Sequence, residues 1–233
     1  MSNLDQVCLF VLDMVPYGHN GRRVLGGRAE GLFMTSTDQR ISAAAVRLFT
    51  EKGSTQITVS ELAQEANVAR GTLYRNVGSV EELFDRVVAE LSADMHERVS
   101  ACFTGIDDPA ARLATGVRLW VRYAFENPMM GRFAVRFGLT AESLRAMMTG
   151  PPKRDIDLGI SAGRYLVTDS AVPNIVSLVL GGTMSAMWTV LEGHQTWREA
   201  GSSTAELLLR SLGIEPEEAR AISRTELPRL PGS

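Results

Sequence analysis

Cysteine is nearly absent from this sequence, and so are the residue groups that build covalent or metal-bound frameworks. The 233 residues include only two cysteines, Cys8 and Cys102, and three histidines. Two widely separated cysteines provide neither a disulfide framework nor the ligand spacing of a metal site. We therefore expect a protein of the reducing cytoplasm that carries no cofactor and no metal.

Catalytic motifs are missing as well. The sequence has no H-E-x-x-H motif, no paired cysteines and no Gly-rich phosphate loop. The serine in "GLTAESLRA" has no nucleophile elbow around it. We therefore expect no enzyme, and we keep a helical enzyme that binds a small molecule as an alternative, which a turnover assay distinguishes.

Strand-like alternation and aromatic residues are also scarce. Aromatic residues make up 6% of the chain, and no segment alternates apolar and polar residues convincingly. The apolar set is dominated by alanine and leucine, which favour helices. The longest uncharged run, 171–191, contains proline, asparagine, serine and threonine, which indicates a buried helix rather than a membrane span. The sequence thus predicts an all-α protein with no membrane partner.

Residues 1–35 differ from the rest of the chain. Their segment "PYGHNGRRVLGG" is rich in turn formers and has no helical period. Two interpretations stay open. Either the native chain starts at Met34, because a clean helical pattern follows almost at once, or the segment is a flexible arm whose arginines contact phosphates. We describe residues 1–35 as a flexible or non-native tail.

From Ser36 the sequence predicts one helix after another. Apolar residues at 41, 45, 48 and 49 share one helical face, and Gly53 ends that helix. Thr58 and Glu61 form a capping box at the start of a short second helix. Asn67 suits the left-handed turn that follows it. A third short helix spans about 69–76, and Ser79 with Glu82 opens a long fourth helix.

Further helices are predicted along the rest of the chain. They begin near Pro109 and Pro128, and two more cover about 140–148 and, with a weaker pattern, the segment "PKRDIDLGISAG". A long apolar helix is expected at about 174–192. The last two helices are expected at 204–212 and 216–226, followed by a frayed tail at 227–233.

Two short helices joined by a tight turn and packed on a preceding helix are the pattern of a helix-turn-helix. The second short helix would enter the major groove of double-stranded DNA. Arginine, tyrosine, threonine and asparagine side chains contact phosphates or base edges, and glycine lets the backbone approach closely. The residues expected at the DNA interface are Thr58, Arg70, Gly71, Thr72, Tyr74, Arg75 and Asn76.

The segment "TVSELAQEANVARGTLYRNVGSVEEL" resembles the TetR family of bacterial transcriptional regulators. The family pattern is a Thr-capped "TxxxLAxxA", a turn residue, Val, a helix "S-x-G-T-x-Y-x-x-F" and then "xxKExL". This chain departs from it at Ala69, Val77 and Val80, where the family usually has Ser, Phe and often Lys. The resemblance is strong over about residues 37–92 and implies a DNA-binding head followed by a variable ligand-sensing and dimerising body. The departures affect the strength and footprint of DNA binding.

The charge pattern agrees with a local rather than a global affinity for nucleic acid. The chain carries a net charge of −3, whereas residues 37–80 contain five basic and four acidic residues. Two of the bases, Arg70 and Arg75, lie on the proposed recognition helix, which has no acidic residue. The helix is therefore aimed at a polyanion, although the chain as a whole is acidic.

The body is expected to hold an apolar or amphipathic small effector. Methionine and aromatic side chains suit an adaptable apolar pocket, although each of them is also an ordinary core residue. The candidate pocket residues are Trp120, Tyr123, Met130, Phe133, Phe137, Met147, Met184 and Trp188. His194, near Trp188 and Trp197, is interpreted as a surface residue at a helix end.

A homodimer is expected, built on the helices near 174–192 and 204–212. Small residues on the first helix let two helices approach closely, and leucines on the second add apolar area. The alternative is that the apolar helix is only the central helix of a monomer core. The candidate interface residues are Gly181, Gly182, Ser185, Leu208 and Leu212.

The sequence thus predicts a two-domain regulator of transcription, with a DNA-binding head at 36–82 and an effector-binding and dimerising body at 83–226. By default it is a repressor that a small molecule releases from a palindromic operator, while activation stays open. The other alternative to DNA-dependent regulation is a protein-interaction adaptor that binds no operator.

Overall fold

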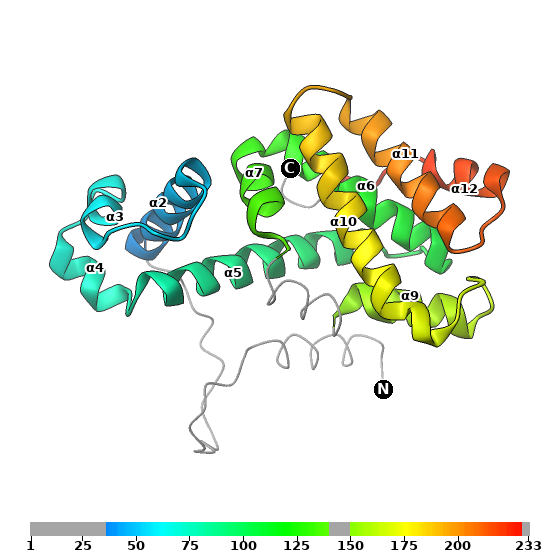
Figure 1. The fold of residues 1–233 in the computed structure, drawn as a ribbon, viewed down its shortest axis with the longest axis horizontal. Helices are drawn as coiled ribbons and strands as arrows, with labels where there is room; N and C mark the ends of the chain where they lie inside the picture. The colour runs from blue at the N-terminus through cyan, green and yellow to red at the C-terminus, as the bar shows by residue number, and fades with distance from the viewer. Residues whose placement is uncertain (1–35, 140–149, 230–233) are drawn as a thin grey trace, which may run out of the picture. The chain divides into compact units, whose positions relative to one another are not determined.

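The computed structural model describes residues 36–139 and 150–229. Within these ranges every regular element is a helix, which confirms the all-α class (Figure 1). The tail predicted at 1–35 and the helix predicted at about 140–148 lie outside the described residues.

The first three helices have the predicted form. They are α2 (Ser36–Lys52), α3 (Val59–Glu65) and α4 (Arg70–Asn76). Gly53 follows α2 with a φ of 65°, and Asn67 adopts a φ of 51° between α3 and α4, so both left-handed stops occur where the sequence places them. The Thr58–Glu61 capping box forms in full, with the Thr58 hydroxyl accepting from the Glu61 N–H and the carboxylate accepting from the Thr58 N–H.

Helix α5 (Val80–Ala101) follows as a single long helix. The Ser79 hydroxyl accepts from the Glu82 N–H over 3.1 Å, but the Glu82 side chain does not complete the predicted box and lies beside Gly78 instead. Only half of this predicted capping box therefore forms, and one serine cap is sufficient to start the helix.

The remaining helices are α6 (Pro109–Glu126), α7 (Pro128–Phe137), α9 (Pro151–Ser161), α10 (Val172–Leu191), α11 (Trp197–Ser211) and α12 (Pro216–Ser223), with a 3-10 turn at Asp169–Ala171. Helix α11 starts well before the predicted Thr204. A second full capping box, formed by Thr196 and Glu199, fixes this earlier start, and the sequence pattern for it was overlooked.

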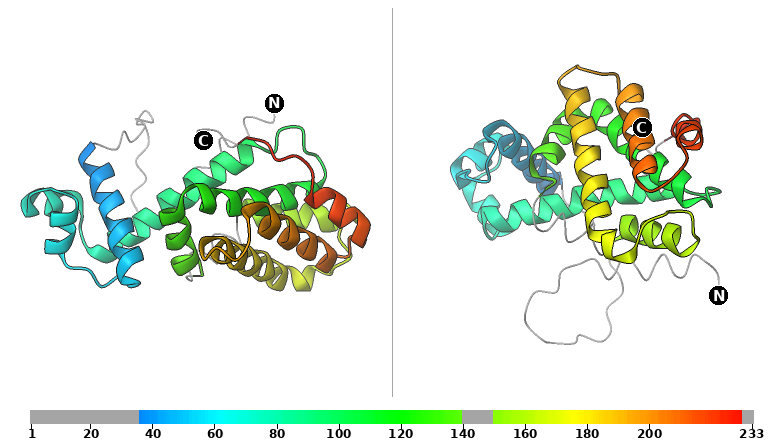
Figure 2. Two further views of the ribbon diagram at one scale, coloured as in Figure 1. Left: turned by 90° about the horizontal axis from the view of Figure 1, so that it is seen from above. Right: turned by 45° about the vertical axis from the view of Figure 1, so that its right-hand side comes forward.

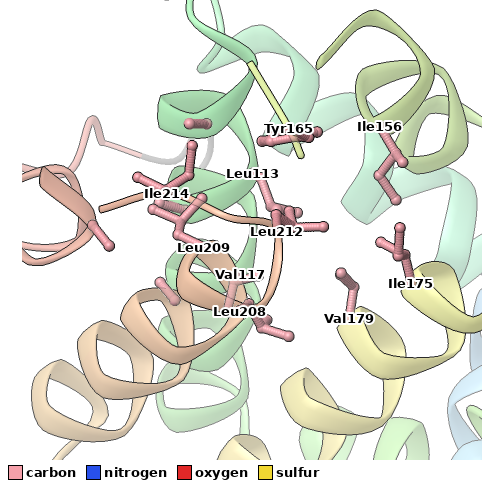
Figure 3. Packing of buried hydrophobic residues seen from close by; sticks show 14 of the residues in the cluster. Leu113, Val117, Ile156, Tyr165, Ile175, Val179, Leu208, Leu209, Leu212 and Ile214 are labelled. Carbon is pink, nitrogen blue, oxygen red and sulfur yellow. The ribbon is translucent and has the colours of Figure 1, made fainter. Parts of the chain in front are cut away.

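Helices α10 and α11 both pack on α6, and their apolar faces form the largest core cluster (Figures 1 and 2). Figure 3 shows leucines of α11 meeting Leu113 and Val117 of α6, with Val179 of α10 closing the cluster. The span 169–191 is long and apolar enough to cross a membrane, but half of it is buried inside the protein. This burial agrees with the core helix that the sequence predicts.

A second core cluster lies under the helix-turn-helix. It contains the buried faces of α2, α3 and α4 together with Leu83 and Val87 of α5. Phe133 of α7 is buried in the same cluster, and Met130 and Phe137 pack against it. The helix-turn-helix therefore shares its core with two helices that also border the rest of the protein.

Candidate nucleic-acid interface and ligand cavity

Helix α4 presents the polar surface that the sequence predicts. Leu73 is its buried residue, whereas Arg70, Gly71, Tyr74 and Arg75 are exposed, with Tyr74 at 65%. A Cβ added at Gly71 would meet no atom within 4 Å, so no neighbouring helix requires this glycine. Because Gly71 is exposed, a side chain at this position would obstruct only a partner outside the chain.

Two other predicted interface residues are less available than expected. Thr72 and Asn76 are half-buried. The Asn76 amide donates to the Thr72 carbonyl over 2.7 Å, and the Arg75 guanidinium donates to the Thr72 hydroxyl over 3.3 Å. Asn76 therefore supports the end of α4, and its side-chain donor is engaged within the helix.

Thr58 is exposed, but its hydroxyl is engaged in the cap of α3, where it also donates to Glu61 over 2.9 Å. Glu61 in turn accepts from Lys52 over 2.5 Å. The Lys52 hydrogen bond, followed by those from the Thr58 backbone and hydroxyl, lowers the pKa of Glu61 to about 2. Lys52 is thus neutralised by an acid of the head.

Two more basic residues of the head are also engaged within it. Arg47 pairs with Glu65 over 2.6 Å. Arg40 donates to the carbonyl of Ala66 over 3.2 Å and to that of Asn67 over 2.7 Å, so it caps the turn between α3 and α4. This role could not be predicted from the sequence, because the two partners are more than twenty positions away along the chain.

Arg70 and Arg75 are the remaining bases of the predicted head, and neither forms an ion pair among the described residues. The five bases counted from the sequence thus divide into three that stabilise the head and two that face solvent from α4. The positive charge available to a polyanion is concentrated on this one short helix.

The departures from the family pattern have visible local effects. Ala69 begins α4 without any side-chain cap. Val77 is buried and Val80 is half-buried against the core of the head, so both positions serve packing. Val80 therefore offers no cation to a phosphate.

A cavity of about 170 Å³ lies among α5, α6, α7, α9 and α10. Six of the eight predicted pocket residues line it: Trp120, Tyr123, Met130, Phe133, Phe137 and Met184. Met147 lies outside the described residues. Trp188 is 49% exposed, packs on His194 with ring centroids 5.5 Å apart, and does not line the cavity.

The cavity also contains polar groups that the sequence analysis did not select. Arg112 of α6 and Asp155 of α9 form an ion pair of 2.9 Å. Burial raises the pKa of Asp155, and the charge of Arg112 opposes that rise. The ring of His96 in α5 packs edge to face on Trp120, with centroids 5.8 Å apart. Burial lowers the pKa of His96, so its neutral form is favoured.

His96 had a signal in the sequence. Val88, Leu91, His96 and Val99 lie on one face of α5, and Phe103 follows just after the end of the helix. A histidine within an apolar stripe at helical spacing indicates a partly buried ring. Arg112 and Asp155 had no such signal, because their pairing brings together two helices far apart in the sequence.

The predicted interface residues of α10 and α11 separate into two groups. Gly181 has open space where a Cβ would project, and Ser185 is exposed. In contrast, a Cβ at Gly182 would lie 3.6 Å from side-chain atoms of Leu208 and Thr204 in the same chain.

Leu208 and Leu212 are buried in the core of a single chain, where they pack against α6 (Figure 3). Their side chains are consequently not available to a second chain. The exposed apolar residues of this region are Leu178, Trp188 and Leu207, of which Leu207 is 63% exposed. The amphipathic period of α11 explains the difference, since positions 208 and 212 share the inward face that position 207 does not.

Comparisons with known proteins cover both halves of the structure. The family of bacterial regulatory proteins named for tetR matches residues 41–87, and the family of tetracyclin repressor-like C-terminal domains matches residues 108–225. An uncharacterised HTH-type transcriptional regulator of Mycobacterium tuberculosis is 30% identical over 111 residues, which cover 48% of this chain and 54% of the relative. The match therefore spans about half the length of this curated relative.

Two solved structures are similar over most of the described residues. The structure of RolR with the ligand resorcinol is 25% identical, covers 83% of this chain and 96% of that chain, and has a TM-score of 0.63. A tetR family transcription regulator from Shewanella sp. PV-4 is 20% identical, covers 76% of this chain and 98% of that chain, and has a TM-score of 0.67, which shows a shared fold. With both family domains matched in order along it, this chain belongs to the TetR family of bacterial regulatory proteins.

Proposed function

We propose that this protein is a sequence-specific, DNA-binding regulator of transcription whose operator binding is controlled by a small molecule. The observation that carries the proposal is the division of bases in the head. Three bases are engaged internally, and Arg70 and Arg75 project from α4 without an acidic partner among the described residues. Cations concentrated on a recognition helix supply both phosphate contacts and base readout.

The proposed division of the chain follows the sequence analysis. Residues 36–82 form the DNA-binding head, and residues 83–226 form the body that binds the effector and a second protomer. As a regulator of transcription, the protein acts in the cytoplasm and needs no catalytic activity, which agrees with the regulatory character of the family.

In the proposed complex α4 lies in the major groove. Arg70, at the start of the helix, reaches base edges, because the first residues of a recognition helix are the ones that enter deepest. Tyr74 and Arg75 donate to phosphates from the exposed side of the helix. Gly71 lets the backbone approach the DNA closely.

The effector site in this proposal is the cavity beside the head. Phe133 and Phe137 line the cavity and also pack into or against the core of the head. A bound molecule that displaces these rings changes the support of α2 and α5, and thereby the position of α4. The related RolR structure holds a small aromatic compound, resorcinol, which supports a ligand-controlled regulator.

A homodimer completes the proposal. The exposed side of α10 and α11 carries Leu178 and Leu207 together with the small residues Gly181 and Ser185. Exposed leucines beside small residues suit close packing of helices from two chains. A two-fold dimer would present two copies of α4 to the half-sites of a palindromic operator about one helical turn apart.

Selection of bound fragments from random duplex DNA tests this function. The expected result is an inverted repeat whose half-sites lie about one turn apart. If the folded protein enriches no sequence above background, it is not an operator-binding regulator, and the adaptor alternative replaces this proposal. Transcription from a promoter that carries the selected site, measured with and without the protein, then distinguishes a repressor from an activator.

A further inference from the structure

The cavity is large enough for a ligand with one ring. Its volume is about 170 Å³, and its walls come from five helices. An apolar protein cavity of about 150 Å³ holds a benzene molecule. A single ring with one or two small substituents therefore fits.

The walls match the face of an aromatic ring. Trp120, Phe133 and Phe137 supply aromatic surfaces, and Met130 and Met184 supply polarizable thioethers. Aromatic pairs in offset or edge-to-face contact, and sulfur–aromatic contacts, add to the burial of apolar area. These side chains favour a flat aromatic ligand over an aliphatic one of equal size.

The charges around the cavity cancel. Arg112 and Asp155 pair with each other over 2.9 Å, and burial lowers the pKa of His96, which favours its neutral form. A charged ligand would lose its hydration on entry, and the counter-charge it needs is already engaged in the ion pair. An uncharged ligand avoids this cost.

His96 offers a hydrogen-bond acceptor to the cavity. Its Nδ1 lies 2.7 Å from the Ser92 carbonyl oxygen. A carbonyl oxygen only accepts, so Nδ1 carries the hydrogen, and in a neutral ring Nε2 is then an acceptor. No described residue donates to this nitrogen. A ligand hydroxyl is the donor that would satisfy it.

Arg112 is not an open donor to the cavity. Its Nε has no hydrogen-bond partner among the described residues, but it is buried and so out of reach of a ligand. Its guanidinium lies over the Phe103 ring, 4.9 Å from the centroid, and pairs with Asp155. His96 is therefore the residue from which we argue a hydrogen bond to a ligand.

We infer that the effector is an uncharged aromatic molecule of one ring that carries a hydroxyl group. The hydroxyl donates to His96 Nε2. The ring lies among Trp120, Phe133 and Phe137. This inference rests on the proposed function, because it takes this cavity to be the effector site of the regulator.

Calorimetric titration of the DNA-free protein tests the ligand class with three one-ring probes: resorcinol, toluene and benzoate. Toluene has the ring without hydroxyls, and benzoate has the ring with a charge. Resorcinol is expected to bind about tenfold more tightly than either, because toluene cannot donate to His96 and benzoate would bury a charge. Equal or tighter binding of toluene or benzoate, or no binding of resorcinol, would overturn the inference.

Variants locate the hydrogen bond. His96→Phe keeps an aromatic ring against Trp120 but removes the acceptor, so resorcinol affinity should fall about tenfold. The matched control is His194→Phe, at an exposed histidine outside the cavity lining, and it should leave resorcinol affinity unchanged. His96→Leu also removes the acceptor, and serves if His96→Phe does not fold. Unchanged affinity in a folded cavity variant contradicts the assigned contact.

DNA binding is measured separately on the same preparations. A protein that binds its selected operator but none of the probes would disprove the ligand class and leave the regulator intact. A protein that binds resorcinol through His96 but selects no DNA sequence would disprove the proposed function and keep the cavity chemistry.

Discussion

The rings of Phe84 in α5 and Phe137 in α7 pack edge to face, with centroids 5.1 Å apart and planes inclined at 74°. Phe84 packs against the core of the DNA-binding head, and Phe137 both packs there and lines the cavity. A molecule in the cavity thus touches a side chain that supports the head directly. In the proposed regulator this pair is a route from the effector to α4.

Phe137→Leu tests that route. Leucine keeps most of the apolar volume but loses the edge-to-face contact, which is worth about 0.5–1.5 kcal/mol. We expect operator affinity without ligand to stay within about twofold, while a compound that releases the wild-type protein changes the affinity of the variant several-fold less. Fluorescence anisotropy with labelled operator measures both quantities.

The matched control is Phe125→Leu, at an exposed phenylalanine of α6 that does not line the cavity. It should respond to the ligand as the wild type does. If Phe137→Leu also responds fully, the signal reaches the head by another contact.

Two glycines with opposite surroundings give a second prediction. A Cβ at Gly71 would meet nothing within 4 Å, so Gly71→Ala should raise stability by about 0.5–1 kcal/mol through better helix propensity. The same methyl group would project from α4 toward the DNA, so operator affinity should fall. Thermal unfolding and anisotropy on one sample compare the two effects, and an unchanged affinity would place Gly71 outside the interface.

Gly131→Ala is the contrasting substitution. Its Cβ would lie 2.8 Å from the Cβ of Ala124 and 3.0 Å from its Cα, where α6 and α7 approach closely. Overpacking at such a site costs about 1–3 kcal/mol. This variant should therefore unfold at a lower temperature, in the direction opposite to Gly71→Ala.

The turn between α3 and α4 gives a third prediction. Arg40→Met removes the donors to the carbonyls of Ala66 and Asn67 while keeping an apolar stem of similar length. We expect a loss of about 1 kcal/mol of stability from these partly exposed hydrogen bonds. Operator affinity should fall as well, because the turn sets the position of α4.

The control is Arg47→Met, which breaks only the exposed pair with Glu65 and should destabilise the protein less. Equal effects of the two substitutions would show that the turn cap is unimportant.

The starts and ends of the helices in the head could be predicted from the sequence, because they depend on interactions between residues close together in the chain. A threonine or serine cap, a glycine stop and an asparagine in a left-handed turn each act within a few residues. The start of α11 was missed although the same signal was present at Thr196 and Glu199. The polar segment "EAGSSTAE" that follows has little apolar periodicity, so the pattern of apolar residues predicted a helix start only at Thr204.

Tertiary pairing could not be predicted in the same way. Leu207, Leu208 and Leu212 are chemically alike, and only their phase relative to α6 decides that 208 and 212 are buried while 207 is exposed. The Arg112–Asp155 pair and the Arg40 cap depend on contacts between distant segments. Six of the eight predicted pocket residues do line the cavity, because methionine and aromatic side chains suit an adaptable apolar pocket.

The fourth prediction concerns the proposed dimer. Leu207→Glu places a charge on the exposed side of α11, where the wild-type leucine is 63% exposed in a single chain. If this side packs on a second protomer, the buried and unpaired carboxylate should split the dimer while each chain stays folded. Light scattering measures the mass, and circular dichroism confirms the fold.

Leu158→Glu, at an exposed leucine of α9, is the control and should remain dimeric. A Leu207→Glu variant that stays dimeric removes this face from the interface.

The salt dependence of operator binding, compared between the wild type and two arginine variants, tests the central claim most directly. Arg75→Ala should weaken binding to all sequences and flatten the log–log salt slope by about one unit, because one phosphate contact is lost. Arg70→Ala should relax the preference at one position in each half-site by about 1–3 kcal/mol. Arg224→Ala, at an exposed arginine after α12, removes the same charge far from α4 in sequence and should change neither quantity. If Arg75→Ala and Arg70→Ala both bind with the same slope and the same sequence preference as the wild type, α4 is not the surface that binds DNA.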